Sequence, residues 1–201
     1  MLIESILFKI MQVNYKKKIL DAMLDHVPFD GWNEDLFKVA AKDLKSTPEA
    51  LKLHFEGGII AVVDYFSQQN DEKMVKGIEK ISKDARIRDK IAEAVLIRLK
   101  LYEKKKSIIA KTVSFLSLPW NAPYAAKFAW RTCDLIWKHA GGDRSTDFNY
   151  YSKRSLLFGI YTAVIMYWLN DESKDHADTK RFLDDRIEDV MKIGKMIGKK
   201  R

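Results

Sequence analysis

Helix-breaking residues are scarce in this chain and gather at a few positions between long segments of apolar and charged residues. Only 4 of the 201 residues are proline and 9 are glycine. A composition this poor in breakers and rich in lysine, leucine, isoleucine and alanine favours helices. Apolar residues recur at helical spacing, and no segment alternates as a half-buried strand would. The sequence therefore predicts an all-α protein.

The expected helices cover most of the chain, and the first three form a helix-turn-helix pattern that Gly57 and Gly58 close. Pro28 and Gly31 end the first helix, and Ser145-Thr146 is a capping sequence before the helix at 147. This layout is that of bacterial TetR-type regulators. We expect a TetR-like helical bundle, with a helix-turn-helix-like region at 1–57 and a second helical region at 58–201. The expected helices span 2–25, 33–44, 47–55, 59–81, 84–105, 108–118, 124–139, 147–169 and 179 to near the end.

The segment that would read DNA, residues 47–55, is poorly suited to that role. Lys52 is its only fully basic residue, and Pro48 and Glu49 occupy the end where base and phosphate contacts are usually made. Neutralisation of phosphates dominates DNA affinity, and Glu49 would repel them. We therefore expect a degenerate helix-turn-helix and no nucleic-acid partner, with a TetR-type transcriptional regulator as the alternative.

The patterns that usually mark an enzyme are missing from the sequence. The four histidines form no Glu-x-x-His or His-x-x-x-His pair, and no glycine-rich phosphate loop or Gly-x-Ser-x-Gly is present. The single cysteine, Cys133, is interpreted as a small buried apolar residue. We expect no catalysis, no metal and no cofactor.

Two arguments concern the location of the protein. The longest charge-free runs, 112–126 and 155–170, are shorter than the roughly 20 apolar residues that a membrane span needs. The first 24 residues lack the order of a secretory signal and the composition of a transit peptide. These features lead us to expect a cytoplasmic protein.

Residues 116–123, which contain Pro119 and Pro123, link two apolar helices. Prolines favour an extended link. The segment is either a buried turn between helices or the mouth of an apolar pocket. The candidate pocket residues are Phe115, Leu116, Leu118, Trp120, Phe128 and Trp130.

Two further segments each allow two interpretations. Tyr150 and Arg154 share one helical stripe; either they form an exposed interface anchor, or the tyrosines pack inward while Arg154 caps an acidic neighbour. The last helix is either docked with a solvated face or lies on an anionic membrane surface. Its candidate membrane-contact residues are Lys192, Lys195, Lys199, Lys200 and Arg201.

Several of these stretches together resemble one protein family. They run from about residue 14 to 193, and the most specific is Ser145-Thr146-Asp147-Phe148-Asn149 with Tyr151 and Arg154. The chain resembles the lipid-binding accessory family of ubiquinone (coenzyme Q) biosynthesis, the ninth protein of that pathway. The other matching stretches are His26-Val27-Pro28 to Trp32, Leu118-Pro119 with Asn121 and Pro123, Trp137 with Ala140-Gly141, and Arg181-Phe182-Leu183 with Arg186 and Asp189.

The resemblance implies a TetR-like fold that has exchanged DNA binding for lipid binding. Such a protein binds isoprenoid quinone intermediates in an apolar cavity and presents them to the di-iron demethoxyubiquinone hydroxylase. It also forms a homodimer and touches the membrane through its C-terminal amphipathic helix. For this chain the implied ligand is a lipid or isoprenoid quinone, and the implied location is peripheral, on the inner face of a bacterial inner membrane.

The family's partner surface maps onto Ile136, Tyr150 and Tyr151, and we add Arg154 from the same helical stripe. Tyr150 stands where the mitochondrial members usually have tryptophan. With Gly141-Gly142, the loop before Asp143 is one residue longer than in the family.

Overall fold

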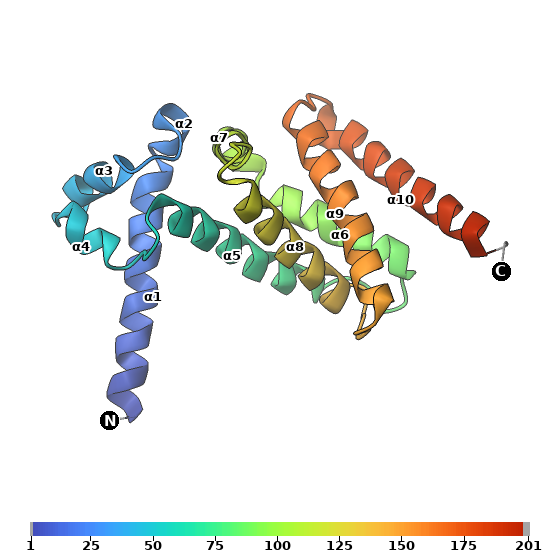
Figure 1. Cartoon of the computed structure of the whole chain (residues 1–201), viewed down its shortest axis with the longest axis horizontal. Helices are drawn as coiled ribbons and strands as arrows, with labels where there is room; N and C mark the ends of the chain where they lie inside the picture. Colours follow the sequence, from blue (N-terminus) through green and yellow to red (C-terminus); the bar gives the residue numbers. More distant parts are fainter. Residues whose placement is uncertain (1, 199–201) are drawn as a thin grey trace. The chain divides into compact units, whose positions relative to one another are not determined.

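A computed structural model describes the backbone of residues 2–198 and the side chains of residues 11–192, and this part of the chain is helical without strands. None of the described helices combines the length and apolarity needed to cross a bilayer. Figure 1 labels the helices. They are α1 (Leu2–Leu24), α2 (Val27–Asp30), α3 (Leu36–Asp43), α4 (Pro48–Lys52), α5 (Ile59–Ile78), α6 (Ile87–Lys100), α7 (Lys106–Leu116), α8 (Ala122–His139), α9 (Phe148–Leu169) and α10 (Ala177–Gly198), with 3-10 turns at Glu103–Lys105 and Lys174–His176.

The chain divides into two compact units whose borders differ from the predicted border at residue 57. The first unit contains the residues up to Gln68 together with Ser107–Tyr124, and the second contains Gln69–Lys106 together with the chain from Ala125 onward. Part of α5 and all but the first residue of α7 thus join the helix-turn-helix region. One reason is a hydrogen bond in which Trp32 Nε1 donates to Thr112 Oγ1 of α7 at 2.9 Å.

In the first unit, α1 packs against α2 and α3, and α3 packs against α4. The core of this unit includes Ile19, Met23 and Phe37, each fully buried. The turn α2 was not predicted: Pro28 stands in its first turn, where proline is tolerated. Gly31, at φ 70°, ends it in a conformation that favours glycine.

A side-chain hydrogen bond in the turn before α3 and a side-chain cap on α4 fix the residues that follow α2. Asn33 Oδ1 accepts a hydrogen bond from the Asp35 backbone at 2.9 Å, and α3 begins three residues later than predicted. Thr47 Oγ1 accepts from the Ala50 backbone at 3.2 Å, which caps α4 as such residues do.

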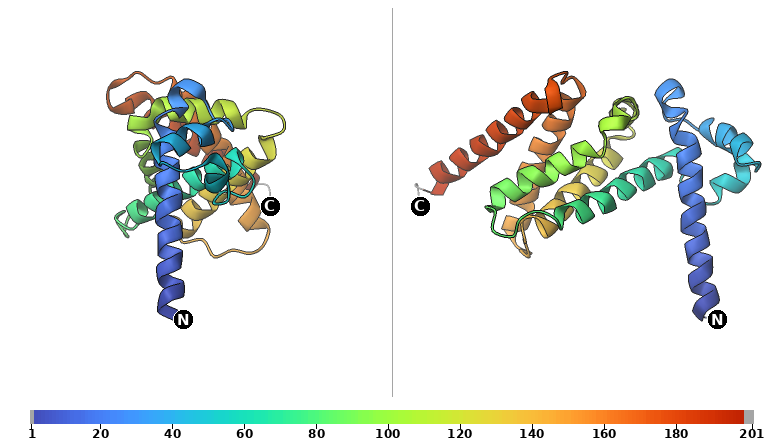
Figure 2. Two further views of the ribbon diagram at one scale, coloured as in Figure 1. Left: turned by 90° about the vertical axis from the view of Figure 1, so that its left-hand side faces the viewer. Right: turned by 180° about the vertical axis from the view of Figure 1, so that it is seen from behind.

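In the second unit, α9 and α10 pack against each other, and both contact α6 (Figure 2). The polar middle of α5 is buried here. Asp71 forms an ion pair with Arg98 Nη1 at 3.1 Å and with Arg131 Nε at 2.9 Å, and it accepts from Thr132 Oγ1 at 2.8 Å. A buried charge needs such pairing. Ile87 is 55% exposed, because α6 begins there.

Candidate functional site

The start of α9 is held by the loop that precedes it. Asp147 caps the helix, because its Oδ1 accepts from the Asn149 backbone at 3.0 Å. The cap is therefore Asp147 rather than the predicted Ser145-Thr146. Ser145 Oγ lies 2.8 Å from both carboxylate oxygens of Asp143 and donates to that carboxylate, which ties the loop to the ion pairs described next.

Arg154 lies at the centre of an ion-pair network between α8, the loop and α9. Its Nε donates to Asp134 Oδ1 at 2.7 Å, and its Nη1 donates to Asp143 Oδ2 at 2.8 Å. The same Nη1 donates to the Tyr150 carbonyl at 3.1 Å. The Arg154 side chain is only 1% exposed. The interpretation in which Arg154 pairs with acidic neighbours is correct, and its predicted exposure is wrong.

Two lysines complete the network. Lys153 Nζ lies 2.7 Å from Asp143 Oδ1, and Lys138 Nζ lies 2.6 Å from Asp134 Oδ2. Hydrogen bonds from Lys153 and then Arg154 hold the pKa of Asp143 well below its usual value. Burial opposes a similar shift at Asp134, but hydrogen bonds from Lys138 and Arg154 still lower its pKa. Both carboxylates therefore stay ionised and keep Arg154 in place.

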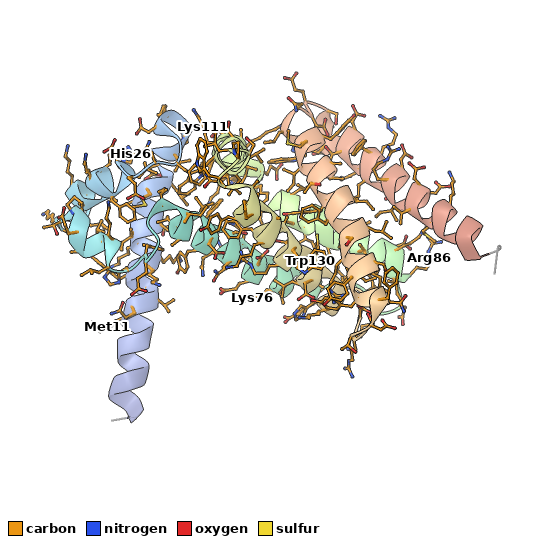
Figure 3. The ribbon with its side chains drawn as sticks, in the orientation of Figure 1. Met11, His26, Lys76, Arg86, Lys111 and Trp130 are labelled. Atoms are coloured by element: carbon orange, nitrogen blue, oxygen red, sulfur yellow. The ribbon has the colours of Figure 1, made fainter. Side chains whose placement is uncertain are left out.

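An aromatic cluster lies against this network, and we call Trp130, Tyr150 and Tyr151 the tyrosine patch. The Arg154 guanidinium lies 3.6 Å from the Tyr150 ring centroid, a cation–π distance, and Tyr150 Oη donates to Asp134 Oδ1 at 3.3 Å. The Tyr151 ring centroid is 5.0 Å from that of Tyr150 and 6.5 Å from that of Trp130 (Figure 3 labels Trp130).

The members of the predicted partner surface differ in accessibility. Tyr151 is 60% exposed, Tyr150 is half-buried, and Ile136 is fully buried. Trp130, which was predicted as a pocket residue, is half-buried. The prediction that Ile136 lies on the surface is wrong for this chain, because α8 turns that side chain into the core of its unit.

Asp134, Asp143 and Lys153 were not identified from the sequence as members of the site. The i, i+4 spacing of Asp134 and Lys138 was the one sequence pattern that could have indicated an ion pair here.

The six predicted pocket residues are distributed over both units. Phe115, Leu116, Leu118 and Trp120 belong to the first, and Phe128 and Trp130 to the second. Trp120 is 70% exposed and Leu118 37%, whereas Phe128 is buried. Asn121 is also buried, and its Nδ2 donates to the Phe115 carbonyl at 2.9 Å, which fixes the turn between α7 and α8.

Three hollows found within the units are lined by other residues. Two lie in the first unit, with volumes of about 500 and 490 Å³, beside Tyr15 and His54 and beside Leu53 and Tyr65. The third, of about 450 Å³, lies in the second unit beside Trp168. Among the described residues, no group of three histidines, cysteines or carboxylates is placed to hold a metal ion.

Cys133 is fully buried, as its interpretation as a small apolar residue predicts. Burial raises the pKa of its thiol to about 12. A thiol with so high a pKa is a poor nucleophile at neutral pH.

The last helix, α10, docks through its first turns. Leu183 is fully buried, and the Phe182 ring stacks on that of Tyr167 at 4.5 Å. Lys192 is exposed, and its Nζ lies 3.1 Å from Glu188 Oε1. The side chain of Lys195, and Lys199, Lys200 and Arg201 as whole residues, fall outside the described part of the chain.

The single lysine of α4 is engaged within its own unit. Lys52 Nζ lies 2.9 Å from Glu34 Oε2 and 5.4 Å from the Phe37 ring centroid. Partial burial opposes the shift, but the hydrogen bond from Lys52 still lowers the pKa of Glu34. The same carboxylate accepts from the Ile59 backbone at 2.8 Å. Lys52 therefore pairs with a carboxylate of its own unit, which offsets part of its charge toward a phosphate.

Comparison with known proteins connects this site to a family. The COQ9 family model matches residues 122–194, which include α8, the loop and α9. The ubiquinone biosynthesis protein COQ9 of Rattus norvegicus is 32% identical over 188 residues, covering 88% of this chain and 59% of that protein. The chain is similar to COQ9-family proteins over most of its length. The human protein of the same name is 31% identical, covering 88% of this chain and 58% of its own length.

Two further findings set the scope of this similarity. The chain spans somewhat less than two thirds of the length of these mitochondrial relatives. A TetR transcriptional regulator from Nitrosomonas europaea matches the structure with a TM-score of 0.68 and 18% identity, covering 87% of this chain and 97% of the regulator. The fold is therefore TetR-like, as the helix-turn-helix pattern predicted.

Proposed function

We propose that this chain serves ubiquinone biosynthesis as a lipid-binding accessory protein and carries out no catalysis of its own. It takes isoprenoid quinone intermediates from the membrane and presents them to the di-iron hydroxylase that acts on demethoxyubiquinone. The similarity to COQ9 proteins supports the pathway, since the named relatives are ubiquinone biosynthesis proteins. A polyprenyl tail needs such a carrier, because each CH₂ left in water costs about 0.8 kcal/mol.

The observation that carries the proposal is the tyrosine patch on its ion-pair support. Tyrosine and tryptophan are the residues that most often anchor protein interfaces. Here an exposed Tyr151 leans on Tyr150, and a buried arginine fixes Tyr150 in turn. A rigid, partly exposed aromatic pair of this kind loses little conformational entropy on binding. In our proposal Tyr151 and Tyr150 contact the hydroxylase, while Arg154 and Ile136 position them from beneath.

The lipid and membrane contacts remain proposals on the residues named above. In our proposal the exposed Trp120 and Leu118 mark the mouth of the lipid pocket in the first unit, with Phe115 and Leu116 as its further walls. The lysines of the last helix contact anionic headgroups, as basic residues beside an apolar stripe do. The protein would then be a peripheral membrane protein.

We also propose a homodimer formed through α9. One strip of this helix is exposed and carries small residues at four-residue spacing, Ser155, Gly159 and Ala163, flanked by Leu156 and Met166, which are 50% and 52% exposed. A Cβ placed on Gly159 would have no atom within 4 Å, so the strip is open. Small residues allow two helix backbones to approach closely, and flanking apolar side chains then interdigitate.

The alternative, a TetR-type regulator, has the fold in its favour and the chemistry of α4 against it. Pro48 and Glu49 begin that helix, and its lysine is paired with Glu34. A DNA-reading element needs free cations that neutralise phosphates. We therefore propose that the helix-turn-helix region keeps its fold without reading DNA.

The experiment that tests the proposal is Tyr151→Ala, with hydroxylase affinity measured by calorimetry on the full chain. We expect the dissociation constant to rise about 30-fold or more, which is the loss of about 2 kcal/mol typical of an interface anchor. Because Tyr151 is 60% exposed, the melting temperature should stay within about two degrees. The control is Phe29→Ala, an 81% exposed aromatic in the other unit. Unchanged affinity with Tyr151→Ala would contradict the proposed partner surface.

A further inference from the structure

The apolar residues of the first half of α1 spread over more of the helix circumference than the buried stripe of the second half. In the second half the buried side chains form one stripe, and Lys17 lies on the exposed side. With 3.6 residues per turn, Ile3, Leu7 and Ile10 of the first half share the register of Asn14 and Lys17, not that of the buried stripe. These three positions of the first half therefore continue the exposed side of the second. The buried stripe consists of Ile19, Leu20, Met23 and Leu24.

Contacts from the rest of the first unit reach the end of this half of the helix, where Tyr65 Oη of α5 donates to the Val13 carbonyl at 3.4 Å. Figures 1 and 2 show residues 2–13 of α1 extending beyond α3 and α4. Met11, labelled in Figure 3, is 68% exposed and Val13 is 55% exposed. The packed part of the helix begins near Tyr15, whose ring lies 4.9 Å from that of His54.

The composition of α1 changes from mostly apolar to basic along residues 2–18. Most of residues 2–13 are apolar, and Tyr15 with the consecutive lysines Lys16, Lys17 and Lys18 follows them. No acidic residue stands between Glu4 and Asp21. An apolar segment that ends in an aromatic residue and then in lysines has the order of a helix at a membrane interface. The apolar residues are Leu2, Ile3, Ile6, Leu7, Phe8, Ile10, Met11 and Val13.

We propose that residues 2–13 of α1 insert into the surface of an anionic lipid bilayer, with Lys16–Lys18 at the headgroups. This contact is separate from the one proposed for α10, since it lies in the other unit. The apolar positions cover about two thirds of the helix circumference, which suits lipid better than a single partner helix, whose contact is a narrow stripe. Twelve residues span about 18 Å, more than one leaflet's share of a hydrocarbon core of about 30 Å.

The lysines Lys16–Lys18 and the hollow beside them also fit an anionic lipid. Lys17 and Lys18 are exposed, and Lys16 Nζ lies 5.5 Å from the Phe55 ring centroid. The apolar hollow of about 500 Å³ lies between Met11 and Lys18, at the level where headgroups meet acyl chains. Basic residues near an anionic membrane surface each contribute about fivefold to binding.

The test is flotation of the full chain with vesicles of phosphatidylcholine, with and without phosphatidylglycerol. The triple variant Ile3→Ser, Leu7→Ser and Ile10→Ser should bind both kinds of vesicle about tenfold or more weakly, because three apolar side chains no longer leave water. The matched control is Phe29→Ser with Leu53→Ser, which removes two exposed apolar side chains, 81% and 80% exposed, from the same unit. It should bind normally.

A second variant tests the charges. Lys17→Glu with Lys18→Glu should weaken binding to the anionic vesicles alone, by about 25-fold or more. A polarity-sensitive fluorophore on Met11→Cys should shift to the blue on binding, and Cys133 is fully buried and so escapes labelling. Circular dichroism confirms that each variant is folded.

Three outcomes would overturn the proposal. The first is vesicle binding by the triple variant that equals that of the parent chain. The second is a fluorophore emission that stays the same on binding. The third is a triple variant that, in sedimentation, loses self-association instead of vesicle binding. Failure here is distinguishable from failure of the proposed function, because the hydroxylase contact is measured without lipid on variants of Tyr151.

Discussion

Arg154 shows how one buried residue organises the candidate site. Its guanidinium contacts two carboxylates, a carbonyl and the face of Tyr150. Removing one partner of a buried ion pair is costly because the other charge is left uncompensated. The sequence left open whether Arg154 was an exposed anchor or a partner of an acid, since helical spacing gives the side of a helix but not what covers it. The covering acid, Asp143, comes from a loop that sequence patterns do not place.

The network makes stability depend on pH in a defined direction. Interactions with Lys153 and Arg154 lower the folded-state pKa of Asp143. A depressed pKa means that the stabilisation is present above the unfolded value, about 3.9, and is lost as the pH falls below it. Asp143→Asn should lower the melting temperature by about 4–8 °C at pH 7, from a loss of about 2 kcal/mol.

The melting temperatures of the parent chain and Asp143→Asn should then converge as the pH is lowered below about 4, toward the depressed folded-state pKa of Asp143, which thermal scans by circular dichroism would detect. The control is Asp21→Asn, which changes an exposed carboxylate on α1. A difference that stays constant down to pH 3 would show that Asp143 contributes through packing and not through its charge.

At the scale of elements, helix existence was predictable and helix ends were less so. The expected helix at 84–105 begins at Ile87 and ends at Lys100, followed by a 3-10 turn. No glycine or proline marks that break. It coincides with the burial of Tyr102, over whose ring the Arg98 guanidinium lies at 5.0 Å. A tertiary contact of this kind overrides local propensity, and so no sequence pattern indicated it.

The exposed strip of α9 leads to a prediction about assembly. In a two-fold dimer through this strip, Gly159→Glu would place two like charges against each other, which costs several kcal/mol. The dimer dissociation constant, measured by sedimentation velocity, should rise about 100-fold or more. Glutamate is a better helix former than glycine, so α9 itself should not be weakened.

The control for the dimer is Ala110→Glu, which adds the same charge at an exposed position of α7. Its sedimentation should match that of the parent chain. A Gly159→Glu protein that still sediments as a dimer would place the dimer interface elsewhere.

For the whole molecule, the sequence predicted the all-α class and the TetR-like layout, and both are confirmed. The fold was accessible because the helix-turn-helix spacing and the breakers are local signals. The site was only partly accessible. Tyr150 was named from its helical stripe and Tyr151 through resemblance. The acids that hold Arg154 come from α8 and a loop, and their meeting depends on tertiary packing. The buried Asp71 network was hidden for the same reason.

Lipid content tests the proposed function of the molecule as a whole. The full chain, purified from a quinone-producing host, should carry isoprenoid or phospholipid that organic extraction and mass spectrometry detect. An apolar tail bound to protein avoids a cost of about 0.8 kcal/mol per CH₂ in water, so it should survive purification.

Trp120→Ser should lower the lipid content at least threefold, because Trp120 stands at the proposed pocket mouth. It should leave the melting temperature nearly unchanged, since that side chain is 70% exposed. Phe29→Ser, equally exposed but distant in sequence, should retain the lipid. If well-folded parent protein yields no extractable lipid, the carrier role is contradicted, and if Trp120→Ser retains all of it, the pocket mouth lies elsewhere.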